Sequence, residues 1–91
     1  MEKVDLAPVE KLLRKLPDFI VVKLRKWAAQ VELHGIIEMR KIPGLHDEPL
    51  KGLRQGQRSI RLSKGYRAIY TEHINGTIKI IRVEEVSKHD Y

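Results

Sequence analysis

A run of cations without any acid is the clearest chemical feature of this sequence. Between Leu50 and Arg67 the chain carries six of them: Lys51, Arg54, Arg58, Arg61, Lys64 and Arg67. Solvated protein surfaces usually mix the two signs of charge, so a stretch of one sign indicates a surface that binds phosphate groups. The net charge of +6 agrees, because such a field attracts polyanions. The plainer alternative is a basic protein without a nucleic-acid partner.

Groups that could move protons flank this run on both sides. His46, Asp47 and Glu48 precede it, and a carboxylate near phosphate-binding arginines is a candidate for acid–base catalysis. The alternative is that Asp47 or Glu48 caps a helix or forms an ion pair. A metal needs three or four converging ligands, whereas these three residues are contiguous and lack a spaced partner, so we predict no metal and no cofactor.

The sequence ends in His89, Asp90 and Tyr91. Histidine is the side chain best suited to proton transfer near neutral pH, and an aromatic ring can stack on an RNA base. A lone terminal histidine is more often an ordinary surface residue, and Tyr91 could instead pack over the edge of the core. Both interpretations stay open at this point.

The first half of the chain has the spacing of helices. Val9, Leu12, Leu13 and Leu16 recur as one face of an amphipathic helix. Pro17 stops this pattern and is suited to begin the next helix, which continues to Gly35 with one further turn over residues 36–40. The sequence therefore predicts a helical hairpin. Residues 4–6 give only a weak signal for a first strand.

The second half has the spacing of strands. Alternation over residues 59–63 and two β-branched or aromatic runs, 67–70 and 78–83, predict three strands. The pair Asn75-Gly76 is a strong hairpin signal between the last two. Two helices followed by an antiparallel meander predict an α+β fold, with the helical hairpin packed on a small twisted sheet.

Strand register decides whether two arginines meet. With a three-residue loop at 63–65 and Gly65 in the left-handed conformation, Leu62 lies opposite Tyr66 and Arg61 lies opposite Arg67. Directly opposed like charges destabilise a sheet by about 0.2–1 kcal/mol, and a phosphate bound between the two guanidinium groups would remove this penalty. A two-residue loop would instead place the arginines on opposite faces.

Length and composition predict the class of protein. A chain of 91 residues is expected to form one domain, 1–91. It lacks cysteine, an apolar signal-peptide core at its N-terminus, and any apolar run near the roughly 20 residues of a membrane span. We therefore expect a cytoplasmic protein with no membrane partner.

Four segments in this order resemble one family. They are Leu45–Gly52 (LHDEPLKG), Gly56–Ser63 (GQRSIRLS), Tyr66–Tyr70 (YRAIY) and Lys88–Tyr91 (KHDY). Together they resemble the RelE/HigB/YoeB superfamily of bacterial type II toxins, with the closest similarity to HigB-like members of RelE type. The resemblance covers nearly the whole chain and implies a microbial-RNase-like fold, with a helical hairpin packed against an antiparallel sheet.

The resemblance also implies an activity, its partners and its residues. The activity is metal-independent, ribosome-dependent cleavage of mRNA in the A site. The implied partners are mRNA, the ribosome with its RNA, a cognate antitoxin, and operator DNA bound by a higher-order toxin–antitoxin complex. By this similarity Glu48 is the general base, Arg61 and Arg67 bind phosphate, and His89 and Tyr91 match the family's terminal pair, although Asp90 intervenes. Which of the three terminal residues transfers the proton stays open.

The residues and the resemblance combine into a hypothesis for cleavage. The ribose 2′-OH attacks the adjacent phosphorus, Glu48 takes its proton, and His89 protonates the leaving oxygen. The cations of the basic run outside this set position RNA without reading its sequence: Lys51, Arg54, Arg58 and Lys64. The alternative is a non-catalytic protein that binds RNA or an antitoxin, which would need neither Glu48 nor His89.

Overall fold

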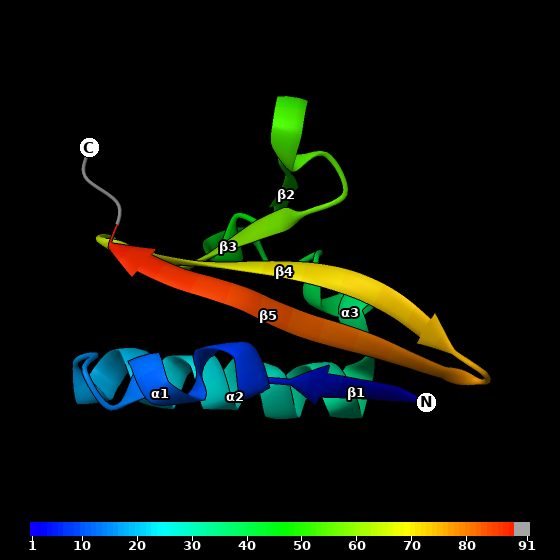
Figure 1. The fold of residues 1–91 in the computed structure, drawn as a ribbon, viewed down its shortest axis with the longest axis horizontal. Coiled ribbons are helices and arrows are strands. Elements are labelled where there is room, and N and C mark those ends of the chain that lie inside the picture. The colour runs from blue at the N-terminus through cyan, green and yellow to red at the C-terminus, as the bar shows by residue number, and fades with distance from the viewer. Residues whose placement is uncertain (89–91) are drawn as a thin grey trace.

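The computed structural model describes residues 1–88, and His89, Asp90 and Tyr91 lie outside the described residues. The elements in chain order are β1 (Glu2–Asp5), the 3₁₀ turn η1 (Ala7–Val9), α1 (Glu10–Leu13), α2 (Asp18–His34), α3 (Ile36–Met39), η2 (Pro43–Leu45), β2 (Glu48–Pro49), η3 (Gly52–Arg54), β3 (Arg58–Ser63), β4 (Tyr66–Asn75) and β5 (Ile78–Lys88). Figure 1 shows α1 and α2 along one side of the long twisted hairpin of β4 and β5, and β3 and β2 on its other side.

The helical half agrees with the sequence prediction except in the length of its first arm. The amphipathic stripe from Val9 to Leu16 contains only one α-helical turn, α1, preceded by η1. Pro17 stands at the N-terminal cap of α2, as expected from its lack of a backbone donor. Gly35 ends α2 with φ of 86°, a value that side-chain-bearing residues rarely adopt. The chain then makes the one extra turn, α3.

The sheet has five strands in the order β1-β5-β4-β3-β2. The predicted meander of β3, β4 and β5 is confirmed, and every pair except β1 with β5 is antiparallel. β1 is the weakly marked first strand, and it pairs parallel to β5 so that Glu2 lies opposite Lys79. Glu2 also accepts a hydrogen bond from the backbone of Ile36, which ties this strand to the start of α3. The predicted α+β fold is confirmed, with one parallel pair that the sequence did not indicate.

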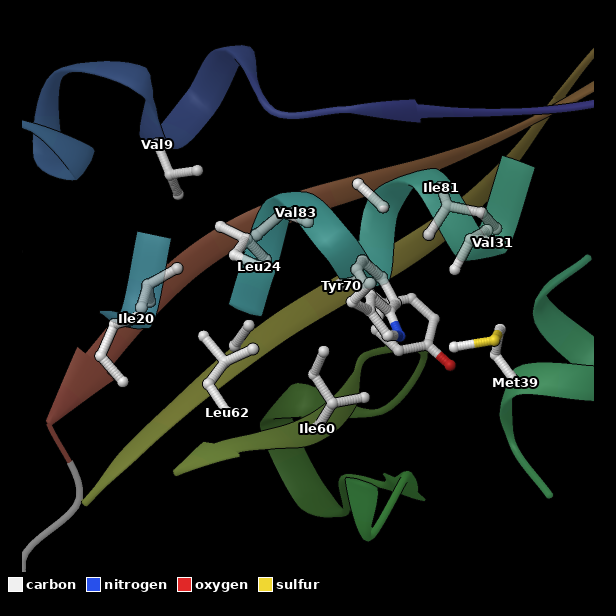
Figure 2. Close-up of a cluster of buried hydrophobic side chains, with 14 of the residues drawn as sticks. Val9, Ile20, Leu24, Val31, Met39, Ile60, Leu62, Tyr70, Ile81 and Val83 are labelled. Atoms are coloured by element: carbon white, nitrogen blue, oxygen red, sulfur yellow. The ribbon is translucent and has the colours of Figure 1, made fainter. Parts of the chain in front are cut away.

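One face of the sheet packs on α2 to form the core, shown in Figure 2. The buried side chains from α2 have the predicted helical spacing, and they meet the inward-facing residues of the strands. The two sets are Ile20, Leu24, Trp27, Ala28 and Val31 from α2, and Ile60, Leu62, Ala68, Tyr70, Ile81, Val83 and Val86 from β3, β4 and β5. Because side chains alternate along a strand, Ser59, Arg67 and Ile69 project from the opposite face.

Candidate functional site

The face opposite the helices holds an arginine next to an exposed carboxylate. Arg67 Nε donates a hydrogen bond of 2.6 Å to Ser59 Oγ, and its Nη2 lies 3.5 Å from Glu48 Oε1. The Arg67 side chain is 13% exposed, whereas that of Glu48 is 65% exposed. The guanidinium is therefore held in place by the sheet, while the carboxylate beside it is open to solvent.

Strand register explains why these three residues converge. Glu48 lies opposite Ser59 in the β2–β3 pair, and Ser59 lies opposite Ile69 in the β3–β4 pair. Directly opposed residues share a face, and so do residues two apart on one strand. Arg67 is two residues from Ile69, so it lies diagonally across from Ser59 on the same face. Sequence reasoning missed Ser59, although the predicted Arg61–Arg67 register already places it there.

The predicted register of Arg61 opposite Arg67 is confirmed, but it arises from a different turn. Ser63 pairs with Tyr66, so the connection has two residues, and a bulge between Arg61 and Ser63 absorbs the extra residue. The predictions that Leu62 faces Tyr66 and that Gly65 is left-handed are therefore wrong; Gly65 does not have positive φ. A bulge adds one residue to one strand, which restores the alignment that a plain two-residue turn would have lost.

The two opposed arginines have different surroundings. Arg67 is engaged by Ser59 and Glu48, whereas Arg61 makes no side-chain hydrogen bond or ion pair with any described residue, and its Nε is buried without a partner. Glu48 offsets the positive charge of Arg67, but no described acidic residue offsets that of Arg61. The expectation that both guanidinium groups clamp one phosphate stays a prediction.

The four cations predicted to position RNA divide into two pairs. Arg54 lies 3.2 Å from Glu85, and Arg58 Nε lies 2.7 Å from Asp47 Oδ1. Within residues 1–88, Lys51 and Lys64 have no acidic partner and are exposed. Lys51 and Lys64 are thus free to bind phosphate, while Arg54 and Arg58 would first have to leave a carboxylate. Binding of RNA by all four stays a prediction.

Asp47 has a structural role that the sequence left open. Its side chain is fully buried, and besides Arg58 it accepts a hydrogen bond from the Tyr70 hydroxyl. That hydroxyl in turn accepts a hydrogen bond of 3.2 Å from Arg40 Nε, and Arg40 also pairs with Glu72. Of the two acids considered for catalysis, Asp47 is therefore an ion-pair partner inside a closed polar network, and Glu48 is the accessible one.

The network shifts the pKa of its members. Burial raises the pKa of the Tyr70 hydroxyl, and the hydrogen bond to Asp47 raises it further. For Glu72, burial alone would raise the pKa, but hydrogen bonds from Arg40 and Lys79 outweigh it and hold the pKa below its usual value. For Arg40, burial opposes the charged form, yet the bonds to Tyr70 and Glu72 raise the pKa. Tyr70 therefore stays a neutral donor, while Arg40 and Glu72 stay charged.

The remaining predicted site residues are His89 and Tyr91, which lie outside the described residues together with Asp90. The strand that precedes them ends beside the site, because Ser87 pairs with Arg67 and Lys88 pairs with Tyr66. His46 ends η2 in the left-handed conformation, with φ of 45°. In the part of the chain that the structure describes, no three His, Asp or Glu side chains gather as a metal site would require. None of the helices in residues 1–88 combines the length and apolar character of a membrane span.

Comparison with solved structures identifies the fold. The chain matches a YoeB/ParE toxin from Agrobacterium tumefaciens at 20% identity, with a TM-score of 0.62 over 98% of both chains. It matches the RelBE2 toxin–antitoxin complex from Mycobacterium tuberculosis at 20% identity and a TM-score of 0.65, over 96% of both chains. It matches YafQ from E. coli strain BL21(DE3) at 19% identity and a TM-score of 0.56, over 97% of this chain and 91% of YafQ.

These structures share the RelE/YoeB-type toxin fold, and this chain has that fold. No model of a protein family matches the sequence, and neither does any curated protein. The resemblance read from the four motifs is therefore confirmed at the level of the fold. The closer similarity to HigB-like members stays a prediction.

Proposed function

We propose that the chain is the toxin of a type II toxin–antitoxin system and that it cleaves mRNA in the ribosomal A site. The observation that carries this proposal is the placement of Arg67 between Ser59 and the exposed Glu48. A fixed guanidinium supplies directed donors for a phosphate. A solvent-accessible carboxylate beside it supplies a base for a ribose hydroxyl. The toxin fold of the structural neighbours supports the same conclusion.

The chemistry is an internal transfer at phosphorus. Glu48 takes the proton of the 2′-OH while that oxygen attacks the adjacent phosphorus. The bond to the 5′-oxygen breaks, His89 supplies the proton to that leaving oxygen, and the product is a 2′,3′-cyclic phosphate. Arg67, with Arg61, binds the phosphate oxygens on which charge develops. Tyr91 orients a base or the phosphate.

The proposed partners follow from charge and from the fold. Lys51 and Lys64 are exposed and without acidic partners among residues 1–88, so they suit phosphate contacts with mRNA and ribosomal RNA. Arg54 and Arg58 can contact RNA phosphates after they leave Glu85 and Asp47. One structural neighbour is a toxin–antitoxin complex, which supports a cognate antitoxin as a partner here. Operator binding by the assembled complex and a cytoplasmic location belong to the same proposal.

Cleavage on programmed ribosomes tests the proposal. Glu48→Gln removes the base while keeping the shape of the side chain, and cleavage should slow by roughly 10²–10⁴-fold. Arg67→Ala should slow cleavage at least as much, and His89→Ala should slow it measurably. Matched controls are Glu10→Gln and Arg82→Ala, whose side chains form the ion pairs Glu10–Arg25 and Asp5–Arg82 away from the site; both should cleave like the parent. Parent-like rates for both Glu48→Gln and Arg67→Ala would contradict the assignment.

A second candidate function is non-catalytic binding of RNA or of an antitoxin. The observation in its favour is that Glu48 already contacts Arg67, so the arginine has a partner without any phosphate. A binding protein would not arrest growth when it is expressed, whereas a toxin would, with relief from the neighbouring gene. Growth arrest by the parent together with harmless expression of Glu48→Gln distinguishes the two functions.

A further inference from the structure

A groove on the helix side of the sheet is separate from the Glu48–Arg67 cluster. It has a volume of about 710 Å³ and lies between α2, η2 and the end of β3 with its turn. Neither Glu48 nor Arg67 lines it; Arg61 is the only member of the proposed catalytic set that does. Lys64, which is proposed to contact RNA, lines it too, so a ligand in the groove would share Arg61 and Lys64 with the proposed RNA site.

The charges of the groove all have one sign. Four cations line it, and no acidic residue does: Lys23 and Lys26 from α2, and Arg61 and Lys64 from the β3 end. Both α2 lysines are exposed, and neither pairs with an acid among residues 1–88. A ligand that fits this rim carries negative charge at more than one point.

The lining between these cations is largely apolar. Its apolar residues are Trp27, Ile42, Leu45 and Leu62, and Gln30, Gly44 and Ser63 complete the lining. Ile42 is 42% exposed, so part of this apolar surface is accessible to a ligand. A concave apolar surface with a few polar groups is the usual form of a binding pocket. The ligand should therefore present an apolar side chain as well as negative charges.

Two buried donors support the view that the groove takes a ligand. Only two buried side-chain nitrogens in the described part of the chain lack a hydrogen-bond partner: Trp27 Nε1 and Arg61 Nε. Both residues line this groove. A buried donor without an acceptor costs about 1–3 kcal/mol, and such groups normally find a partner. A carboxylate can accept from both kinds of N–H group.

The shape of the lining favours a peptide over RNA. RNA recognition by this kind of site relies on exposed aromatic rings that stack on bases. The one aromatic residue here, Trp27, is only 2% exposed and packs on Tyr70, with ring centroids 5.5 Å apart. Its ring face is thus already covered, and the other apolar residues are aliphatic, as suits an aliphatic side chain of a protein.

We propose that this groove binds an acidic segment of a partner protein, with one aliphatic side chain seated on Leu62 and Ile42. Carboxylates of the segment pair with Lys23, Lys26 and Lys64, and one of them accepts from Arg61. This interaction surface goes beyond the proposed cleavage activity and holds whether or not the chain cuts RNA.

Binding of a designed peptide tests the proposal on the intact protein. The probe is a short fluorescent peptide that alternates leucine with glutamate, and its two controls replace glutamate by glutamine or leucine by serine. The charge reversal Lys23→Glu with Lys26→Glu should weaken binding by about tenfold or more, equivalent to about 1.4 kcal/mol. The control Lys11→Glu with Lys15→Glu changes the net charge equally on exposed residues outside the groove, and it should change the Kd by less than about twofold.

A second measurement locates the peptide. The chain has a single tryptophan, so the indole N–H of Trp27 gives one resonance, which the acidic peptide should shift and the two control peptides should not. Equal loss of affinity in both charge-reversed proteins would show attraction by net charge alone and overturn the proposal. An unshifted indole resonance would overturn it as well. If oligouridine displaces the peptide and also shifts the Trp27 indole resonance, the groove binds RNA instead of a protein segment.

Discussion

Asp47 and Glu48 are adjacent acids with opposite surroundings. The Asp47 side chain is fully buried and holds Arg58 and Tyr70, whereas that of Glu48 is 65% exposed and lies 3.5 Å from Arg67. Since neighbouring residues of an extended chain point in opposite directions, one carboxylate enters the polar network and the other stands beside the arginine. Asp47 thus stabilises the sheet edge from which Glu48 projects. Single substitutions can test this difference between the two acids.

The largest effect on stability is expected from Asp47→Ala. It removes a buried charge and leaves Arg58 and the Tyr70 hydroxyl without their acceptor, which should cost roughly 3–5 kcal/mol of unfolding free energy. Urea unfolding measures this loss. The matched change Glu48→Ala should stay within about 0.5 kcal/mol of the parent. Equal losses of unfolding free energy in Asp47→Ala and Glu48→Ala would contradict the separate roles of the two acids.

A smaller loss is expected from Tyr70→Phe. The ring and its packing on Trp27 are kept, but Asp47 loses one donor and Arg40 loses one acceptor, at a cost of about 1–3 kcal/mol. The control is Tyr66→Phe, a less buried tyrosine on the same strand, which should unfold like the parent in the same urea titration. If Tyr70→Phe unfolds at the same urea concentration as the parent, water can replace the Tyr70 hydroxyl in its hydrogen bonds.

Lowering the pH should weaken the polar network slightly, because Glu72 becomes protonated. Its pKa is held below the ordinary value of 4.5, so its contribution to stability is fully present above that value and is lost as the pH falls through the lower, folded-state pKa. A partly exposed pair of this kind contributes about 0.2–1 kcal/mol. The difference in unfolding free energy between the parent and Glu72→Gln should therefore shrink from neutral pH to well below 4.5. A difference that stays constant over this range would argue against the ion pair.

The smallest effect on stability is expected from Lys51→Ala near the open carboxylate. Lys51 is exposed and has no acidic partner among residues 1–88, so unfolding should change by no more than about 0.5 kcal/mol. Its expected effect is on RNA binding, where the slope of log affinity against log salt should fall by roughly 0.7–1. The same titration with Lys41→Ala, which removes a lysine paired with Glu38, should leave the slope unchanged.

The sequence predicted the features that depend on local spacing. The amphipathic stripe of α2, the proline at its start and the glycine at its end all lie within one segment, so their pattern is readable without the fold. The alternation in β3 and the glycine turn before β5 are local as well. Even so, the Arg61–Arg67 pairing was predicted through the wrong turn, because a bulge at Leu62 has no sequence mark of its own.

Features that depend on distant residues were not predictable. Asp47 meets Tyr70 across 23 positions, and neither residue indicates the other in the sequence. Arg58 looked like a free cation of the basic run, but its acidic partner, Asp47, lies before the run and 11 positions from Arg58. The weak first strand gave no indication of its parallel pairing with β5, because strand direction is set by the connections between elements.

The pairing of β1 with β5 constrains the order in which the molecule can fold. Glu2 lies opposite Lys79, so the first strand to be made finds its partner only after nearly the whole described chain has been synthesised. Contacts between such distant positions slow folding, because a large loop must close before they form. β5 also lies between β1 and β4, so the sheet cannot assemble across its middle until that strand has left the ribosome. The complete five-stranded sheet can therefore form only after β5 has been synthesised, late in the synthesis of residues 1–88.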